Sequence, residues 1–153
     1  MAVDGPVGAW DLVAYELRDA SDAVVEHPLG ARPLGLLVYA ADGHMSVFHA
    51  RRERTAPDAR SWAHLTDVER AVASRGFDSY GGRFEWYGDH VVHEVEVALY
   101  PGWIGRRLVR RAELDGDVLV LRAEHTPPGE SRPALTWRRR PGAGASPRAA
   151  HQA

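Results

Sequence analysis

The sequence predicts an all-β domain: a single up-and-down antiparallel β-barrel of about eight strands with one short helix. First, short segments of alternating apolar and polar residues recur, joined by Asp-Gly and Gly-Asp turns. Second, Trp10 lies in a Gly-x-Trp segment that begins the first of them, and Trp137 lies in the last. If the first and last strands pair, the barrel has no open edge, and a large side chain fills its closed end.

The strands follow from the alternation and from the residues that interrupt it. A long first segment is followed by a short one, and Pro28, Gly30 and Pro33 then break the chain. The next two segments flank Asp42-Gly43, a strong hairpin signal, and the second half of the chain repeats the pattern. The expected strands are residues 8–18, 24–27, 34–41, 45–49, 80–87, 90–99, 105–114, 118–124 and 134–139.

One segment departs from this pattern and predicts the helix. Residues 50–63 are polar and rich in arginine, as in a loop. Thr66 and Glu69 then have the spacing of a capping box, so a helix is expected to begin at Thr66 and end before Gly76. Its apolar stripe is thin, which is typical of a surface or lid helix.

Composition limits the classes of function. A chain of 153 residues with net charge −2 is one domain, with no overall field that would attract nucleic acid or an anionic membrane. Cysteine and lysine are absent, which excludes thiolate catalysis and a Schiff-base lysine, and we expect no cofactor. We expect a cytoplasmic monomer or homodimer, with a barrel domain over residues 1–140 and a disordered tail over 141–153.

The order and spacing of these landmarks resemble the bacterial lipocalin-like domain family. The matching stretches, between residues 8 and 139, are GAWDLVAYELRD, PLGLLVYAADGHMSV, TDVERA, YGGRFEWYGDHVVHEVEVALYPGWIG, LVRRAELDGDVLVL and LTWRR. The resemblance implies a calycin-type barrel with an internal cavity for a small apolar or amphipathic molecule. Such domains include plain binders and proteins recruited as cyclases or isomerases in secondary metabolism.

Three polar residues are candidates for catalysis or for orienting a ligand. Alternation places His93 on an apolar face, where it is either a general acid/base or a satisfied core histidine. Arg110 shares a face with apolar neighbours, and an arginine inside the barrel needs a partner. Glu16, on the expected face of Trp10, is one candidate partner, and a ligand carboxylate or enolate is another. The alternatives are a structural Arg-Glu pair or an Arg110 that points outward.

Apolar and aromatic residues on the expected inner faces and at the barrel rim are candidates for the pocket wall, with ordinary barrel core as the alternative. These ligand-binding candidates are Tyr39, Met45, Tyr80, Phe84, Val95, Val97, Tyr100 and Trp103. Trp10, Trp137 and Arg139 are expected to be structural, as a ring plug with an arginine stacked on it.

Three hypotheses about function follow. The first is a barrel that binds a hydrophobic or aromatic small molecule. The second is a cofactor-independent cyclase or isomerase acting on a polyketide-like substrate, in which His93 moves a proton and Arg110 stabilises an oxyanion. The third and weaker one is a haem-binding barrel with His93 or His125 as axial ligand. The histidine spacings fit no metal motif, so no metal site is expected.

Overall fold

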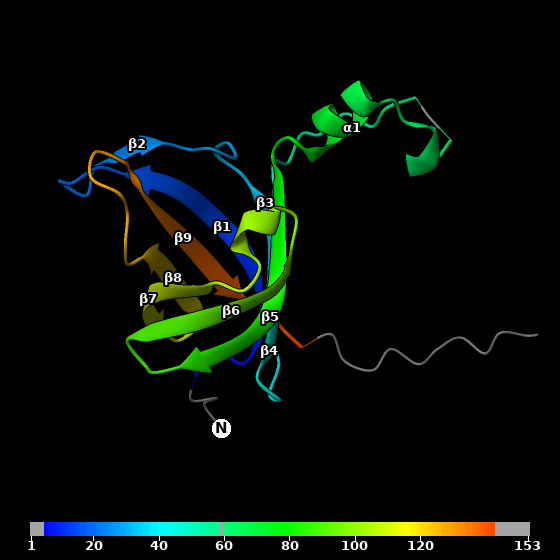
Figure 1. Ribbon diagram of the computed structural model, residues 1–153. Helices are drawn as coiled ribbons and strands as arrows, with labels where there is room; N and C mark the ends of the chain where they lie inside the picture. The colour runs from blue at the N-terminus through cyan, green and yellow to red at the C-terminus, as the bar shows by residue number, and fades with distance from the viewer. Residues whose placement is uncertain (1–4, 59, 143–153) are drawn as a thin grey trace, which may run out of the picture.

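The computed structural model describes residues 5–58 and 60–142, and its strands form one antiparallel sheet closed into a barrel (Figure 1). The strands are β1 (Gly8–Arg18), β2 (Val24–Glu26), β3 (Leu34–Tyr39), β4 (His44–Ala50), β5 (Phe77–Trp86), β6 (His90–Ala98), β7 (Arg107–Asp115), β8 (Val118–Ala123) and β9 (Arg132–Arg139). Each strand from β3 onward pairs with its successor, β1 pairs with both β3 and β9, and the short β2 pairs with one end of β1. The predicted up-and-down barrel is therefore confirmed. Most of the expected tail, residues 143–153, lies outside the described residues.

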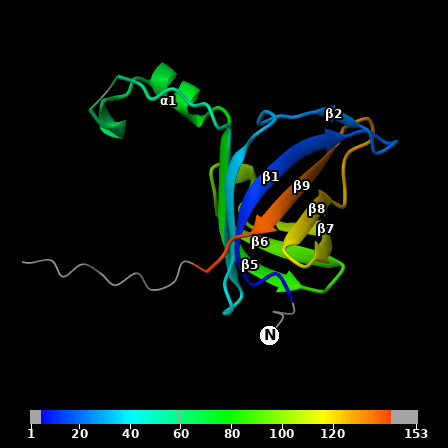
Figure 2. The same ribbon diagram turned by 180° about the vertical axis from the view of Figure 1, so that it is seen from behind.

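The junction of the first and last strands contains the buried plug. β1 and β9 lie side by side in the view from behind (Figure 2), and they pair from Trp10 opposite Arg139 to Arg18 opposite Arg132. Trp10 is fully buried, and its indole N–H donates to the Pro6 carbonyl at 2.8 Å. The Arg139 guanidinium lies 4.2 Å from the centroid of the Trp10 ring and donates to two backbone carbonyls. The arginine stacks on a tryptophan, as the sequence predicts.

A β-bulge in β1 changes which side chains face the barrel interior. Leu12 pairs with Trp137 and Ala14 with the next residue of β9, so Val13 is an extra residue without a partner. After a bulge the alternation continues with the opposite parity. Tyr15 therefore faces inward and Glu16 outward. The expectation that Glu16 shares the face of Trp10 is wrong, because strict alternation takes no account of the bulge.

A second bulge lies in β6. Gly81 pairs with Val97 and Gly82 with Val95, which leaves Glu96 as the extra residue. Val97 consequently points outward and is 66% exposed, so its prediction as a pocket residue is wrong. Glycine is required opposite the bulge, because a Cβ on Gly82 would lie 1.9 Å from the Glu94 carbonyl oxygen.

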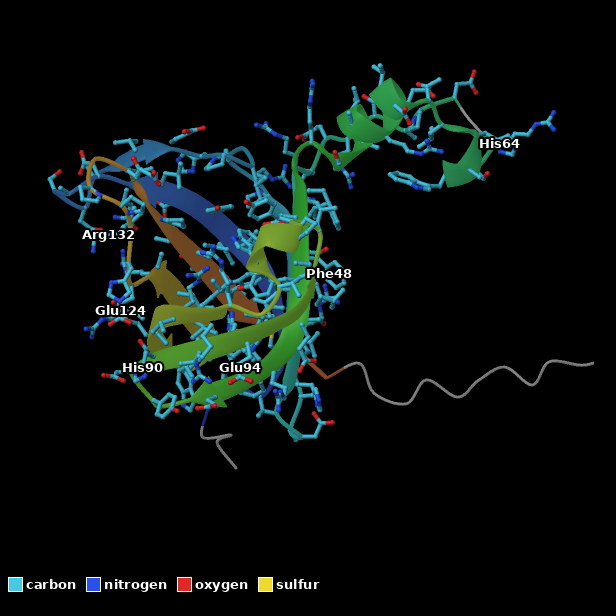
Figure 3. All side chains as sticks on the ribbon, in the orientation of Figure 1. Phe48, His64, His90, Glu94, Glu124 and Arg132 are labelled. Atoms are coloured by element: carbon cyan, nitrogen blue, oxygen red, sulfur yellow. The ribbon has the colours of Figure 1, made fainter. Side chains whose placement is uncertain are left out.

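The segment between β4 and β5 forms an arm that stands away from the barrel (Figures 1 and 2). It contains the 3₁₀ turn η1 (Trp62–His64) and the helix α1 (Asp67–Ser74), and Figure 3 shows His64 far out on it. The predicted capping box is confirmed: the Glu69 N–H donates to the Thr66 hydroxyl, and the Thr66 N–H donates to the Glu69 carboxylate. α1 buries no residue, as expected of a surface helix. Within the described ranges, no helix has the length and apolar character needed to cross a bilayer.

Candidate ligand site

The barrel encloses a cavity of about 110 Å³ that is lined by side chains from β1 and β3–β9 and by the turn η2 (Pro101–Trp103). Its wall is mostly apolar, with a small number of polar groups among the aromatic and aliphatic ones. The lining residues are Tyr15, Leu37, Val47, His49, Asp78, Tyr80, His93, Trp103, Arg110, Leu121, Ala123, Pro133, Leu135 and Trp137. An apolar cavity with a few convergent polar groups is the usual form of a small-molecule site.

His93 is held between two tyrosines in the barrel interior. Its side chain is 2% exposed. The Tyr39 hydroxyl lies 2.7 Å from Nε2, and the Tyr80 hydroxyl lies 2.8 Å from Nδ1. Burial, with a smaller contribution from Arg110, lowers the pKa of His93 to about 3, so the imidazole is neutral near pH 7.

The protons in this triad follow from the available partners. The buried Tyr39 hydroxyl has His93 Nε2 as its only hydrogen-bond partner in the described part of the chain, and the opposite tautomer would leave the Tyr39 proton buried without an acceptor. We therefore assign Tyr39 as the donor to Nε2. A neutral imidazole then carries its proton on Nδ1 and donates it to the Tyr80 hydroxyl oxygen. The Tyr80 hydroxyl lines the cavity and keeps its own proton free to donate to a ligand.

Arg110 enters the cavity but does not pair with Glu16. Its guanidinium contacts the Val109 carbonyl at 3.4 Å and forms no ion pair with any carboxylate of residues 5–58 and 60–142. Glu16 instead forms an ion pair with Arg18 at 3.1 Å, on the outer side of β1. The expected Glu16–Arg110 pair is therefore wrong, as the bulge in β1 requires.

Trp137 belongs to the buried cluster that contains Trp10, and it also forms part of the cavity wall. It is 1% exposed and lies against His49, with ring centroids 5.7 Å apart. Its indole N–H has no hydrogen-bond partner among the residues that the structure describes. A buried tryptophan N–H normally has a partner, so this donor is available to a molecule in the cavity.

The other predicted pocket residues divide into three groups. Tyr80 and Trp103 line the cavity, with their rings edge to face at 5.7 Å. Tyr100 is 59% exposed and packs edge to face on the outer side of Trp103. The remainder pack in the core beside the cavity without lining it: Tyr39, Met45, Phe84 and Val95.

Sequence reasoning missed three polar lining residues. His49 shares a face of β4 with the buried Met45 and Val47, so alternation alone would have found it. Asp78 pairs across the sheet with His49 and lies on the Tyr80 face of β5, but an expected strand start at residue 80 excluded it. Tyr15 was missed because the bulge reverses its face.

The histidines do not fit haem or a structural metal. Both ring nitrogens of His93 are hydrogen-bonded to tyrosines, and His125 is exposed in the loop between β8 and β9. The cavity, at about 110 Å³, is also smaller than the pockets that bury drug-sized ligands. A porphyrin is at least as large as such a ligand, so it would not fit. Over the described ranges, His, Asp and Glu form no cluster of three or more that would suit a metal ion.

Acidification is expected to destabilise the protein through its two buried histidines. Burial lowers the pKa of His49 to about 4 and that of His93 to about 3, against about 6.5 in the unfolded chain. The unfolded state therefore binds more protons below pH 6.5, and stability falls as the pH drops from 6.5 toward 4, by up to about 1.4 kcal/mol per pH unit for each histidine. Urea denaturation between pH 7 and pH 4.5 measures this slope.

A pair of variants tests whether the buried histidines cause this dependence of stability on pH. His49→Gln should reduce it, because one titrating group is removed from the interior. His125→Gln, at an exposed loop position, should leave it unchanged. An unchanged slope in His49→Gln would show that the acid sensitivity arises elsewhere.

Comparison with known proteins agrees with this architecture. Residues 7–140 match the lipocalin-like domain family. The chain is also similar to the 4'-hydroxy-3'-methoxypropiophenone carrier protein ppsC of Aspergillus oryzae (strain ATCC 42149 / RIB 40). The two are 40% identical over 87 residues, which cover 50% of this chain and 78% of that protein. With a family match over nearly all of the described barrel, the chain belongs to the lipocalin-like domain family.

Proposed function

We propose that the barrel binds a small aromatic molecule in its interior cavity. The observation that carries this proposal is a mostly apolar cavity wall that contains a few polar groups, one of which, the Trp137 indole N–H, has no hydrogen-bond partner among the described residues. The cavity, at about 110 Å³, is of the same order as the cavity of about 150 Å³ that binds benzene, so its size is that of a site for a single aromatic ring. The relative named as a propiophenone carrier supports the same class, a single ring with a carbonyl group.

Leu37 and Leu121 would contact the faces of the ring, and Trp103 would pack near it at the η2 end of the barrel. Tyr80 is the natural donor to a ligand oxygen, because His93 holds its hydroxyl in place and leaves its proton free. In this function His93 acts as a positioning residue and moves no proton.

A second candidate is a cofactor-independent cyclase or isomerase on the same scaffold, acting on a polyketide-like secondary metabolite. The observation that favours it is the Tyr80 hydroxyl beside the Arg110 cation: burial raises the pKa of Tyr80, and the cation offsets part of that rise. Tyr80 would donate a hydrogen bond to a substrate carbonyl oxygen, the Asp78 carboxylate of the cavity wall would take the proton from the adjacent carbon, and Arg110 would stabilise the enolate that forms. His93 is not the base here, since both of its nitrogens are occupied.

Calorimetric titration with 4-hydroxyacetophenone tests the proposal. The wild-type protein should bind this single-ring ketone. Ala123→Leu, which enlarges a buried side chain of the cavity wall, should weaken binding tenfold or more. Ala50→Leu is the matched control. Ala50 lies two residues after the exposed Phe48, on the same outer face of β4, so this variant should leave binding unchanged.

Two further outcomes are decisive. If the wild-type protein binds no single-ring aryl ketone, or Ala123→Leu binds as tightly as wild type, the cavity is not the ligand site. Chromatography of the recovered ligand separates the two candidates. For this measurement the protein is incubated with a polyketide-like substrate. Recovery of the unchanged substrate indicates a binder, whereas an isomer of equal mass and new retention time indicates a cyclase or isomerase.

A further inference from the structure

We propose that the cavity takes its aromatic ligand as an anion, with a phenolate or carboxylate oxygen bound against Arg110. This inference rests on the proposed function and specifies the chemistry of the ligand. Three hydrogen-bond donors from three different strands carry it: the Arg110 guanidinium on β7, the Trp137 indole N–H on β9 and the Tyr80 hydroxyl on β5.

The first observation is a cation that lacks a counter-ion. Many arginines of the outer surface form ion pairs, such as Arg107 with Glu94 and Arg122 with Asp22. Arg110 faces the cavity and pairs with no carboxylate in the described ranges. A half-buried charge among apolar side chains is costly without a partner, so a ligand anion there would gain a strong charge-assisted hydrogen bond.

The second observation is independent of charge. Trp137 is 1% exposed, lines the cavity and leaves its N–H without an acceptor over the described residues. Indole is a donor only, so the group that satisfies it is an acceptor. Tyr80 adds an O–H whose proton is free, because its oxygen already accepts from His93. An anionic oxygen is the acceptor that satisfies all three kinds of donor.

The surrounding titratable groups leave this positive charge largely uncompensated. Burial raises the pKa of the tyrosines and lowers that of the histidines, so both kinds of group are neutral near pH 7. Asp78 is the acidic residue of the wall, and it accepts a hydrogen bond from the Ser79 N–H. The groups that face Arg110 from the strands around it are Tyr15, Tyr39, His49, Asp78, Tyr80 and His93.

The test compares ligands that differ in charge. The probes are 4-hydroxyacetophenone, its neutral methyl ether 4-methoxyacetophenone, and 4-methylbenzoate. Wild-type protein should bind the phenolate at least tenfold more tightly than the methyl ether. The absorbance band of the phenolate should therefore appear at a pH at least one unit lower in the bound phenol than in the free one. Tight binding of 4-methylbenzoate instead would identify the carboxylate as the preferred anion.

Two variants locate the effect. Arg110→Met keeps an unbranched side chain without its charge, and should lower the ratio of anion affinity to methyl ether affinity to about one. Asp78→Asn removes the opposing carboxylate and should strengthen anion binding severalfold. If Arg110→Met does not fold, as judged by circular dichroism, the pH at which the phenol ionises when bound to the wild-type protein decides whether the cavity prefers the anion.

The outcomes separate this inference from the proposed function. If the methyl ether binds as tightly as both anions and the bound phenol ionises at its free pH, the anion site is wrong and the aromatic cavity stands. If none of the three probes binds, the proposed function and the anion site are both wrong. An anion preference that survives in Arg110→Met would place the binding charge elsewhere.

Discussion

Replacing Trp10 by alanine is expected to lower the free energy of unfolding by about 3–5 kcal/mol, the range found for large aromatic side chains removed from protein cores. Trp10 is fully buried at the seam where β1 and β9 close the barrel. The change also removes the hydrogen bond to the Pro6 carbonyl and the surface on which Arg139 stacks. Chemical denaturation followed by circular dichroism measures the loss.

Trp62→Ala is the matched control for this prediction. Trp62 lies on the arm and is 61% exposed, so its removal should change stability by no more than about 0.5 kcal/mol. A Trp10→Ala variant that loses under 1 kcal/mol would show that the plug does not hold the barrel closed, and that the pairing of β1 with β9 suffices.

Replacing His93 by alanine is expected to destabilise the protein by about 2–4 kcal/mol, because a buried hydroxyl left without its partner costs about 1–3 kcal/mol. Tyr39 would lose its acceptor altogether, since it bonds only to His93 within the described chain. Tyr80 would lose the group that orients its hydroxyl, so ligand binding should weaken as well. Denaturation and calorimetric titration measure the two effects separately.

His90→Ala on the same strand provides the comparison, because His90 is partly exposed, stacks on the exposed Tyr87 and, within the described residues, has a side-chain hydrogen bond to the exposed Asp89 alone. It should lose well under 1 kcal/mol. If His93→Ala instead keeps the stability of the wild type and loses only ligand binding, His93 acts on the ligand directly. The interpretation of His93 as a satisfied core histidine would then be wrong.

Local patterns in the sequence were sufficient to predict the strands, their order and the helix start. Period-two alternation and Gly-containing turns locate the strands, and these signals are local. The capping box of Thr66 and Glu69 is equally local, and it forms as predicted. Closure by the first and last strands followed from the need to cover both edges, which is a property of the whole sheet.

The candidate site was harder to predict, because it depends on faces and partners. The inward positions of His93 and Arg110 follow from regular alternation on β6 and β7. Glu16 and Val97 were misplaced because each follows a bulge. The residue that marks the second bulge, Gly82, lies on the neighbouring strand β5, so it could be connected with the bulge only once the pairing was known. The two tyrosine partners of His93 come from β3 and β5, so their convergence is a property of the closed barrel and not of any segment.

The bulge at Val13 has a consequence for aligning this chain with its relatives. The extra residue is absorbed locally, so a strand that lacked it would keep the same pairing with β9 and the same inward side chains beyond it. A relative one residue shorter at this point therefore needs a gap opposite Val13. Without that gap, the outward-facing Ala14 would be matched to the other protein's counterpart of Tyr15, which lines the cavity in this chain. The alignment would then show a change in ligand specificity where only the strand length has changed.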